Sequence, residues 1–194
     1  MQNALVVIDM QESFRVRPLW RTLHNPGLIA NVGRLVDAAR AAGDEVIWVL
    51  HAEEGSGGEF DPAVGHVRIM DEFASGKNEP IIVKSSHNAF STTNLQQVLT
   101  MRGVGSVTVC GLRTEQCVET TARVASDFGY EVTFVTDATG SFPIPHWTAP
   151  EPQTVEELLA DPRTLAAADV VTRTEYALAG RFATVTSTDA YLGV

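Results

Sequence analysis

Three residues of the sequence are suited to nucleophilic catalysis: Asp9, Lys84 and Cys117. Asp9 and Lys84 each end an apolar run with the composition of a buried strand, and Cys117 follows another such run after a short turn. A cysteine attacks as its thiolate, and a free thiol with a pKa of about 8.5 is only slightly ionised at neutral pH. An aspartate can accept the thiol proton and later return a proton to a leaving amine. Together the three side chains indicate covalent catalysis by Cys117.

Lysine is the group in this set with enough charge to activate the thiol. Lowering a cysteine pKa by about two units takes about 2.7 kcal/mol. A helix N-terminus contributes only about 0.3–1 kcal/mol, whereas an ammonium about 4 Å away contributes about 4 kcal/mol at an effective dielectric near 20. We therefore expect Lys84 to lower the pKa of Cys117 and to keep Asp9 ionised.

Each of the three residues also has a structural interpretation when it is taken alone. Aspartates commonly begin loops, lysines at strand ends are usually solvated, and a cysteine on the inner face of a helix often packs as a small apolar residue. The second cysteine, Cys110, closes the apolar run 106–110 and is predicted to pack in the core. Its spacing from Cys117 excludes Cys-x-x-Cys redox chemistry, and we expect no disulfide between the two thiols.

An alternation of strands and helices is predicted to bring the three candidate residues to one edge of a sheet. Apolar runs predict strands over 4–8, 45–50, 81–83, 106–110, 131–136 and 182–186. Helical spacing predicts helices from Asn25-Pro26 to Gly43, from Thr92 or Thr93, from Cys117 to Gly129, and over about 154–180. This order predicts an α/β fold with a mostly parallel sheet covered on both faces. Ligands of such sheets bind outside the carboxyl ends of the strands, where the three residues lie.

The composition of the whole chain favours an enzyme acting on a small molecule. The 194 residues are 44% hydrophobic and fit one α/β domain over 1–194. A formal net charge of −10 argues against nucleic-acid or membrane partners. No apolar run approaches the ~20 residues of a membrane span, and from the start of this sequence we expect no secretion signal. With two cysteines only, we expect a cytoplasmic protein without a disulfide scaffold.

Four segments of the sequence resemble the isochorismatase-like cysteine hydrolases, in the order and spacing of that family. They are VVIDMQESF, IIVKSSHNAF, VTVCGLRTEQCVETTAR and VTFVTDATGSF, and the closing RFATVTSTDAYL also matches. The family includes nicotinamidases, N-carbamoylsarcosine amidohydrolases and other small-amide hydrolases. The resemblance implies a three-layer α/β/α fold, a six-stranded sheet of order 3-2-1-4-5-6, and a homodimer or homotetramer.

The resemblance also implies roles for individual residues. It places an Asp–Lys–Cys triad on Asp9, Lys84 and Cys117, with hydrolysis through a thioester. In the family a non-proline cis peptide precedes the nucleophile, which here is Leu112–Arg113, and it turns backbone N–H groups inward. The oxyanion donors are then the amides of Arg113 and Cys117.

Four further residues are predicted to contact the substrate. The family match places Gln11 and Phe14 at the border of the pocket. His51 ends the second predicted strand, and Phe142 follows the fifth, so both are expected to line the same edge of the sheet. The charge of Arg113 either pairs locally or faces a substrate carboxylate.

The segment WVLHAEEGSGGEFDPAVGH departs from the nicotinamidase pattern, because it lacks the Asp-x-His of that metal site. His51, Glu53 and His66 remain alternative nitrogen and oxygen ligands. We expect no cofactor and no metal, and a metal-dependent nicotinamidase is the alternative.

Cysteine at position 117 separates this chain from isochorismatases proper, which lack the nucleophile in the family pattern. The favoured activity is hydrolysis of a C–N bond in a small amide, carbamoyl or ureido compound. An inactive family member acting as a binding protein is a further alternative. A phosphatase of the haloacid-dehalogenase type is disfavoured, because Gln11 stands where its second aspartate is required.

Overall fold

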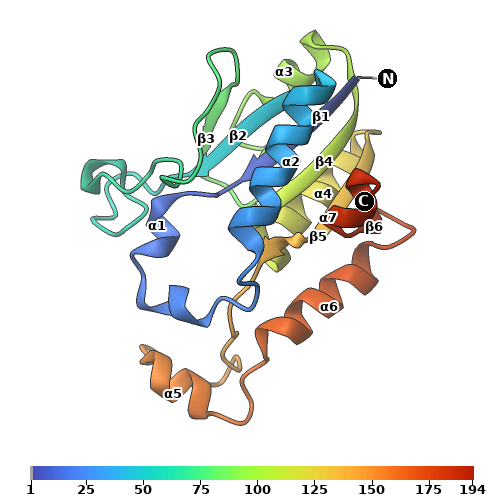
Figure 1. Ribbon diagram of the computed structural model, residues 1–194. Coiled ribbons are helices and arrows are strands. Elements are labelled where there is room, and N and C mark those ends of the chain that lie inside the picture. Colours follow the sequence, from blue (N-terminus) through green and yellow to red (C-terminus); the bar gives the residue numbers. More distant parts are fainter. Residues whose placement is uncertain (1) are drawn as a thin grey trace.

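The computed structural model describes residues 2–194, which contain a six-stranded sheet of order β3-β2-β1-β4-β5-β6 (Figure 1). Every strand pairing in this range is parallel. The strands are β1 (Gln2–Ile8), β2 (Glu45–His51), β3 (Ile81–Lys84), β4 (Val104–Leu112), β5 (Glu131–Gly140) and β6 (Thr184–Thr186). The predicted fold class and strand order are confirmed.

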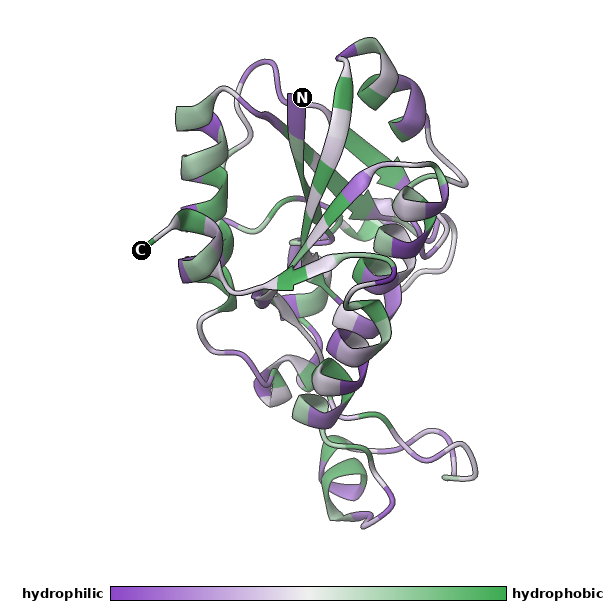
Figure 2. Ribbon diagram, turned by 90° about the vertical axis from the view of Figure 1, so that its right-hand side faces the viewer, coloured by the Kyte–Doolittle hydropathy of each residue, from purple (hydrophilic) through white to green (hydrophobic). Residues whose placement is uncertain are grey.

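The central strand β1 is buried on both faces, as its continuous apolar sequence predicts. Its residues from Ala4 to Ile8 are at most 1% exposed. Val7 pairs with Trp48 of β2 on one side and with Cys110 of β4 on the other. Figure 2 shows hydrophobic residues gathered along the strands between the flanking helices.

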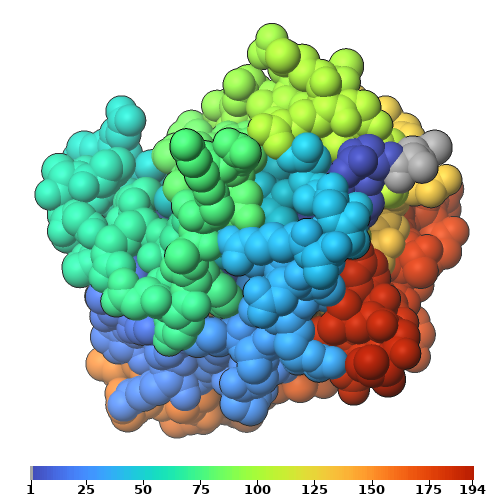
Figure 3. Space-filling model, turned by 45° about the horizontal axis from the view of Figure 1, so that its top comes forward, coloured from blue at the N-terminus to red at the C-terminus, as the bar shows by residue number. Residues whose placement is uncertain are grey.

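Two hydrophobic cores fill the space between the sheet and the helices on its two faces. One face is covered by α2 (Leu28–Ala42), α7 (Thr188–Leu192), α1 (Glu12–Arg15) and the 3-10 helix η1 (Pro18–Thr22). The other is covered by α3 (Leu95–Met101), α4 (Glu119–Asp127) and α6 (Ala167–Leu178). In the space-filling view α2 (blue) and α7 (red) lie beside each other (Figure 3).

Predicted helices differ from the structure in where they begin, and the helix expected from Thr92 or Thr93 begins at Leu95. The helical stretches expected over about 154–180 are α5 (Val155–Ala160) and α6, with a short connection between them. Thr154 and Glu157 form a capping box that starts α5. The helix predicted from Asn25-Pro26 begins at Leu28, because the Asn25 side chain instead accepts a hydrogen bond from the Gly27 N–H in a turn.

The segment from about 144 to 166 leaves the edge of the sheet and carries α5 to the end of the molecule opposite the N-terminus (Figure 1). There α5 lies near η1, and Glu156 of α5 forms an ion pair with Arg21 of η1. Among the helices of residues 2–194, none is long and apolar enough to cross a membrane.

Candidate active site

Asp9, Lys84 and Cys117 come together in the interior of the protein at the carboxyl edge of the sheet. The Nζ atom of Lys84 lies 2.9 Å from Asp9 Oδ2 and 3.2 Å from Cys117 Sγ. The side chains of Asp9 and Lys84 have no exposed surface, and Cys117 is 6% exposed. The sequence predicted this convergence, and one ammonium bridges the carboxylate and the sulfur.

The backbone at the ends of β1 and β4 is shaped to bring these groups close. Asp9 directly follows β1 in a left-handed conformation with φ 53°, and its N–H donates to the Val49 carbonyl at 2.7 Å. In β4, Gly111 has φ +115°, and a Cβ at that position would lie 1.9 Å from the Ile8 carbonyl oxygen. Only glycine allows β4 to approach β1 this closely beside Asp9.

Cys117 lies in η3 (Thr114–Val118), a π-helix that leads directly into α4. Helices of this type occur as short insertions and are frequent at functional sites. The Leu112–Arg113 peptide bond that precedes it is cis. The Arg113 carbonyl accepts from the N–H groups of Gln116 and Val118, at 3.1 and 3.2 Å. The assignment of the Arg113 and Cys117 amides as oxyanion donors stays a prediction.

Burial changes the ionisation expected for the cysteine. Desolvation, and next the charge of Asp9, raise the pKa of Cys117 to about 12, although Lys84 acts in the opposite direction. The expectation that Lys84 is sufficient to lower this pKa was wrong, because it left out the cost of burying a thiolate. Burial therefore favours the neutral thiol of Cys117 over its thiolate.

Asp9 is placed to remove the proton of that thiol. Desolvation raises the pKa of Asp9 above its ordinary value, while the adjacent Lys84 lowers it. Oδ2 is bonded to Lys84, but Oδ1 is buried and has no hydrogen-bond partner within residues 2–194. A carboxylate with a raised pKa and a free acceptor is a stronger base than an exposed aspartate.

His51 is a fourth titratable group at the centre of the site. Its Nδ1 lies 3.4 Å from Lys84 Nζ, and its Nε2 lies 3.3 Å from Glu53 Oε1. Gln11 holds the His51 backbone: its amide donates to the His51 carbonyl at 3.0 Å, and its oxygen accepts from the His51 N–H at 2.7 Å. Because the remaining amide hydrogen of Gln11 bonds Ser13, Gln11 positions His51, and its direct contact with substrate stays a prediction.

An aromatic cluster lies beside the site. Phe14 packs against Phe60 with ring centroids 5.0 Å apart and stacks on Phe142 at 6.3 Å. Phe60 also meets the His51 ring at 5.7 Å. Phe14, Phe142 and His51 were predicted to line a common pocket; ring contacts join them into one cluster, but none of them lines either described cavity, so their contact with substrate stays a prediction. The sequence did not identify Phe60, because it lies in a glycine-rich loop without a periodic pattern.

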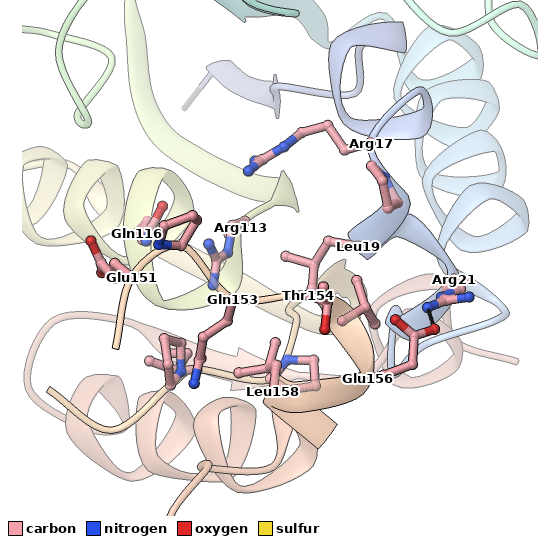
Figure 4. Close-up of a pocket in the computed structure, with 16 residues that line it drawn as sticks. Arg17, Leu19, Arg21, Arg113, Gln116, Glu151, Gln153, Thr154, Glu156 and Leu158 are labelled. Carbon is pink, nitrogen blue, oxygen red and sulfur yellow. Dashed lines mark hydrogen bonds and ion pairs between the residues drawn. The ribbon is translucent and has the colours of Figure 1, made fainter. Parts of the chain in front are cut away.

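A cavity of about 990 Å³ adjoins the nucleophile segment (Figure 4). Its walls come from η1, from Arg113 and Gln116, and from the segment 143–158. Gln116 immediately precedes Cys117, so the cavity borders the triad although the three triad side chains do not line it. A smaller space of about 450 Å³ reaches Lys84 from the side of Glu53.

Cys110 is fully buried in the core, as predicted, and both cysteines are free thiols. Burial alone raises the pKa of Cys110. Nothing polar touches its sulfur in the described part of the chain that would stabilise a thiolate. The reactive environment therefore belongs to Cys117.

The sequence model of the Isochorismatase domain matches residues 3–176. The chain belongs to the isochorismatase family of hydrolases. Nicotinamidase 3 of Arabidopsis thaliana is 34% identical over 154 residues, which cover 72% of this chain and 73% of the relative. Ureidoacrylate amidohydrolase RutB of Agrobacterium fabrum is 27% identical over 172 residues, covering 71% and 75%. The crystal structure of a cysteine hydrolase from Pseudomonas syringae superposes with a TM-score of 0.82 at 25% identity, covering 99% and 91% of the two chains.

The alternative metal ligands of this isochorismatase-family chain do not assemble into a metal site. His51 and Glu53 are neighbours, but no group of three or more His, Cys, Asp or Glu side chains in residues 2–194 is arranged to hold a metal ion. The His51 Nδ1 atom faces the Lys84 ammonium, and a positive charge at that distance opposes a bound cation. The carbonyl of His66 accepts bonds from Ser13, in a structural turn.

Proposed function

We propose that the protein hydrolyses the C–N bond of a small amide, carbamoyl or ureido compound, with Cys117 as nucleophile and a thioester as intermediate. The observation that carries this proposal is the contact of one buried ammonium with both a carboxylate and a thiol. Membership in a hydrolase family supports it, as do relatives named for hydrolysis of nicotinamide and ureidoacrylate and a structural neighbour named a cysteine hydrolase.

The first half of the reaction forms the thioester. Asp9 Oδ1 accepts the thiol proton while Sγ of Cys117 attacks the carbonyl carbon, so the high resting pKa of Cys117 is overcome only as the new C–S bond forms. The carbonyl π electrons move to oxygen, and the amides of Arg113 and Cys117 bind this oxyanion. Asp9 then gives its proton to the leaving nitrogen, the C–N bond breaks, and ammonia or an amine departs.

The second half releases the acid. Asp9, again a carboxylate, accepts a proton from water as the water oxygen attacks the thioester carbon. The C–S bond breaks, and the thiol of Cys117 is re-formed with that proton. Lys84 contacts both Asp9 and Cys117 throughout and offsets the negative charge that passes between them.

Ammonia release from a panel of primary amides and ureido compounds tests the proposal. Cys117→Ala is expected to abolish release, whereas Cys110→Ala, which changes the other buried thiol, is expected to retain turnover. Intact mass spectrometry of quenched reactions is expected to show an acyl adduct on Cys117 that hydroxylamine removes. Turnover that persists in Cys117→Ala, or an adduct on another residue, would overturn the mechanism.

A further inference from the structure

Two arginines, Arg17 and Arg113, line the cavity beside the nucleophile segment, and Arg17 has no ion-pair partner among residues 2–194. Arg17 lines the cavity and forms no ion pair or side-chain hydrogen bond to another residue between 2 and 194. Its guanidinium carbon lies 5.9 Å from the centre of the Phe60 ring. A half-buried guanidinium without a counter-ion loses part of its hydration and gains no bond in return.

The second arginine, Arg113, is more deeply buried and only partly satisfied. Its guanidinium meets Glu115 at 2.9 Å and packs over Phe142 at 5.5 Å. Its side chain is 15% exposed, and its Nε donor is buried without a partner in the described part of the chain. Arg113 thus pairs locally with Glu115, one of the two roles expected from the sequence, but its Nε–H donor has no acceptor in the described part of the chain.

Both arginines line the cavity drawn in Figure 4, and each carries a positive charge there. Burial lowers the pKa of Arg113, and the nearby charge of Arg17 lowers it further. Glu115 neutralises one of the two positive charges. The third arginine of the lining, Arg21, already pairs with Glu156.

The remaining acidic group of the lining is Glu151, which is exposed to solvent. Water screens an exposed carboxylate strongly, whereas the unused Nε of Arg113 is removed from water. One positive charge is therefore left over on the part of the cavity wall that Arg17 and Arg113 form. This excess matches a monoanion such as a carboxylate, and planar guanidinium groups bind carboxylates in a bidentate manner.

We propose that Arg17 and Arg113 form a subsite for a carboxylate of the substrate, so that the substrate is an acid that also carries the amide or ureido group cleaved at Cys117. This inference rests on the proposed function. Gln116 lines the same cavity as the two arginines and directly precedes Cys117 in the chain, which brings the subsite near the nucleophile. The faces of Phe60 and Phe142 beneath the two arginines exclude water from the ion pair and strengthen it.

Binding to the Cys117→Ser protein tests the subsite without turnover. Calorimetric titration compares monoamides of dicarboxylic acids of three lengths, succinamate, glutaramate and adipamate, with the neutral diamides of the same lengths. We expect at least one monoamide to bind at least about tenfold more tightly than its diamide, the usual magnitude for a charge-assisted pair. Equal affinity across the three lengths would overturn the subsite.

Substitutions of Arg17 test whether this arginine causes the tighter binding of monoamides than of diamides. Arg17→Gln is expected to remove most of the preference for the monoamide, and Arg17→Lys to restore part of it. The matched control is Arg34→Gln, which removes an arginine that pairs with Asp189 elsewhere on the surface and leaves the preference unchanged. If Arg17→Gln still binds monoamides more tightly than diamides, the carboxylate binds elsewhere and the proposed subsite is wrong.

Kinetics with the wild-type protein separate this inference from the proposed function. If both hold, Arg17→Gln raises KM for the monoamide about tenfold and changes kcat little, because Arg17 does not touch the reacting atoms. If Cys117-dependent hydrolysis has equal kcat/KM for acidic and neutral amides, the carboxylate subsite is rejected and the proposed hydrolase activity is retained. If the protein binds monoamides selectively but hydrolyses no amide, the proposed hydrolase activity is rejected and the carboxylate subsite is retained.

Discussion

The Nδ1 atom of His51 lies 3.4 Å from the Nζ atom of Lys84. The ammonium has three hydrogens, and it has three neighbours in position to accept them: Asp9, Cys117 and His51. His51 can accept only while it is neutral, with the proton on Nε2 facing Glu53. His51 is therefore a positioning residue that fixes Lys84 between the base and the nucleophile.

Protonation of His51 is expected to inactivate the enzyme at acidic pH. Burial, and next the charge of Lys84, lower the pKa of His51 from its ordinary 6.5, and the charges of Asp9 and Glu53 oppose this. Because the folded pKa is lowered, the neutral form predominates at neutral pH, and the midpoint of the loss lies below pH 6.5. His51→Gln keeps an acceptor for Lys84 but cannot titrate.

The pH dependence of kcat/KM in His51→Gln checks this interpretation. The acid limb of the wild type is expected to reflect two protonations, on Asp9 and His51, with a limiting slope of about two. In His51→Gln the slope falls to about one, and kcat near neutral pH changes less than about tenfold. An unchanged slope would show that His51 does not contribute to the acid limb.

Asp9→Asn is expected to have opposite effects on turnover and on thiol reactivity. Removal of the base abolishes hydrolysis. Removal of its negative charge also leaves Lys84 unopposed beside Cys117, so the pKa of the thiol falls below about 12. Alkylation of Cys117 by iodoacetamide should then become at least about tenfold faster, as follows from a decrease of about one pKa unit. Rates come from peptide mass spectrometry, with Cys110 in the same sample as the internal control, and slower labelling of Cys117 would contradict the assigned charges.

Gly111→Ala is expected to destabilise the fold severely. The new methyl group would meet the Ile8 carbonyl, which belongs to the central strand and cannot move aside. We expect a loss of more than about 3 kcal/mol in the free energy of unfolding, measured with urea. Gly43→Ala is the control: Gly43 also has a positive φ, but open space surrounds it, so its cost is about 1 kcal/mol. Similar losses in the two variants would disprove the close approach of β4 to β1.

Glu79 is expected to make the fold sensitive to acid. Burial alone would raise the pKa of Glu79, but hydrogen bonds from Arg40, Trp48 and Gly76 outweigh it and lower the pKa to about 2. A lowered pKa stabilises the fold above the ordinary value of 4.5, and this stabilisation is lost as the pH falls toward about 2.

Glu79→Gln should therefore lower the free energy of unfolding by about 2 kcal/mol near neutral pH, with a smaller further loss on acidification than in the wild type. Denaturation at several pH values measures both effects. Glu54→Gln, at an exposed position, provides the control. The same acid-dependent loss in Glu79→Gln and wild type would rule out this role of Glu79.

The sequence allowed prediction of the sheet and of the group at its carboxyl edge, because apolar runs mark buried strands and parallel strands end together. The strand order came from a family resemblance and not from the runs themselves. The short helix α7 carries no strong periodic signal, and it was missed. The pKa of Cys117 was predicted in the wrong direction, because the degree of burial is set by packing from distant segments. Arg17 was overlooked because it lies far from Arg113 in the sequence, and only folding places both residues on the wall of one cavity.

Because the Asp9–Lys84 ion pair is buried, the rate of the chemical step should depend little on the ionic strength of the solution. Mobile ions screen charges that water reaches, over about 10 Å at 0.1 M salt, but neither side chain of this pair has exposed surface. Sodium chloride should therefore leave kcat almost constant, while the half-buried Arg17 loses attraction for an anion. Salt would weaken capture of the substrate and spare the bond cleavage that follows.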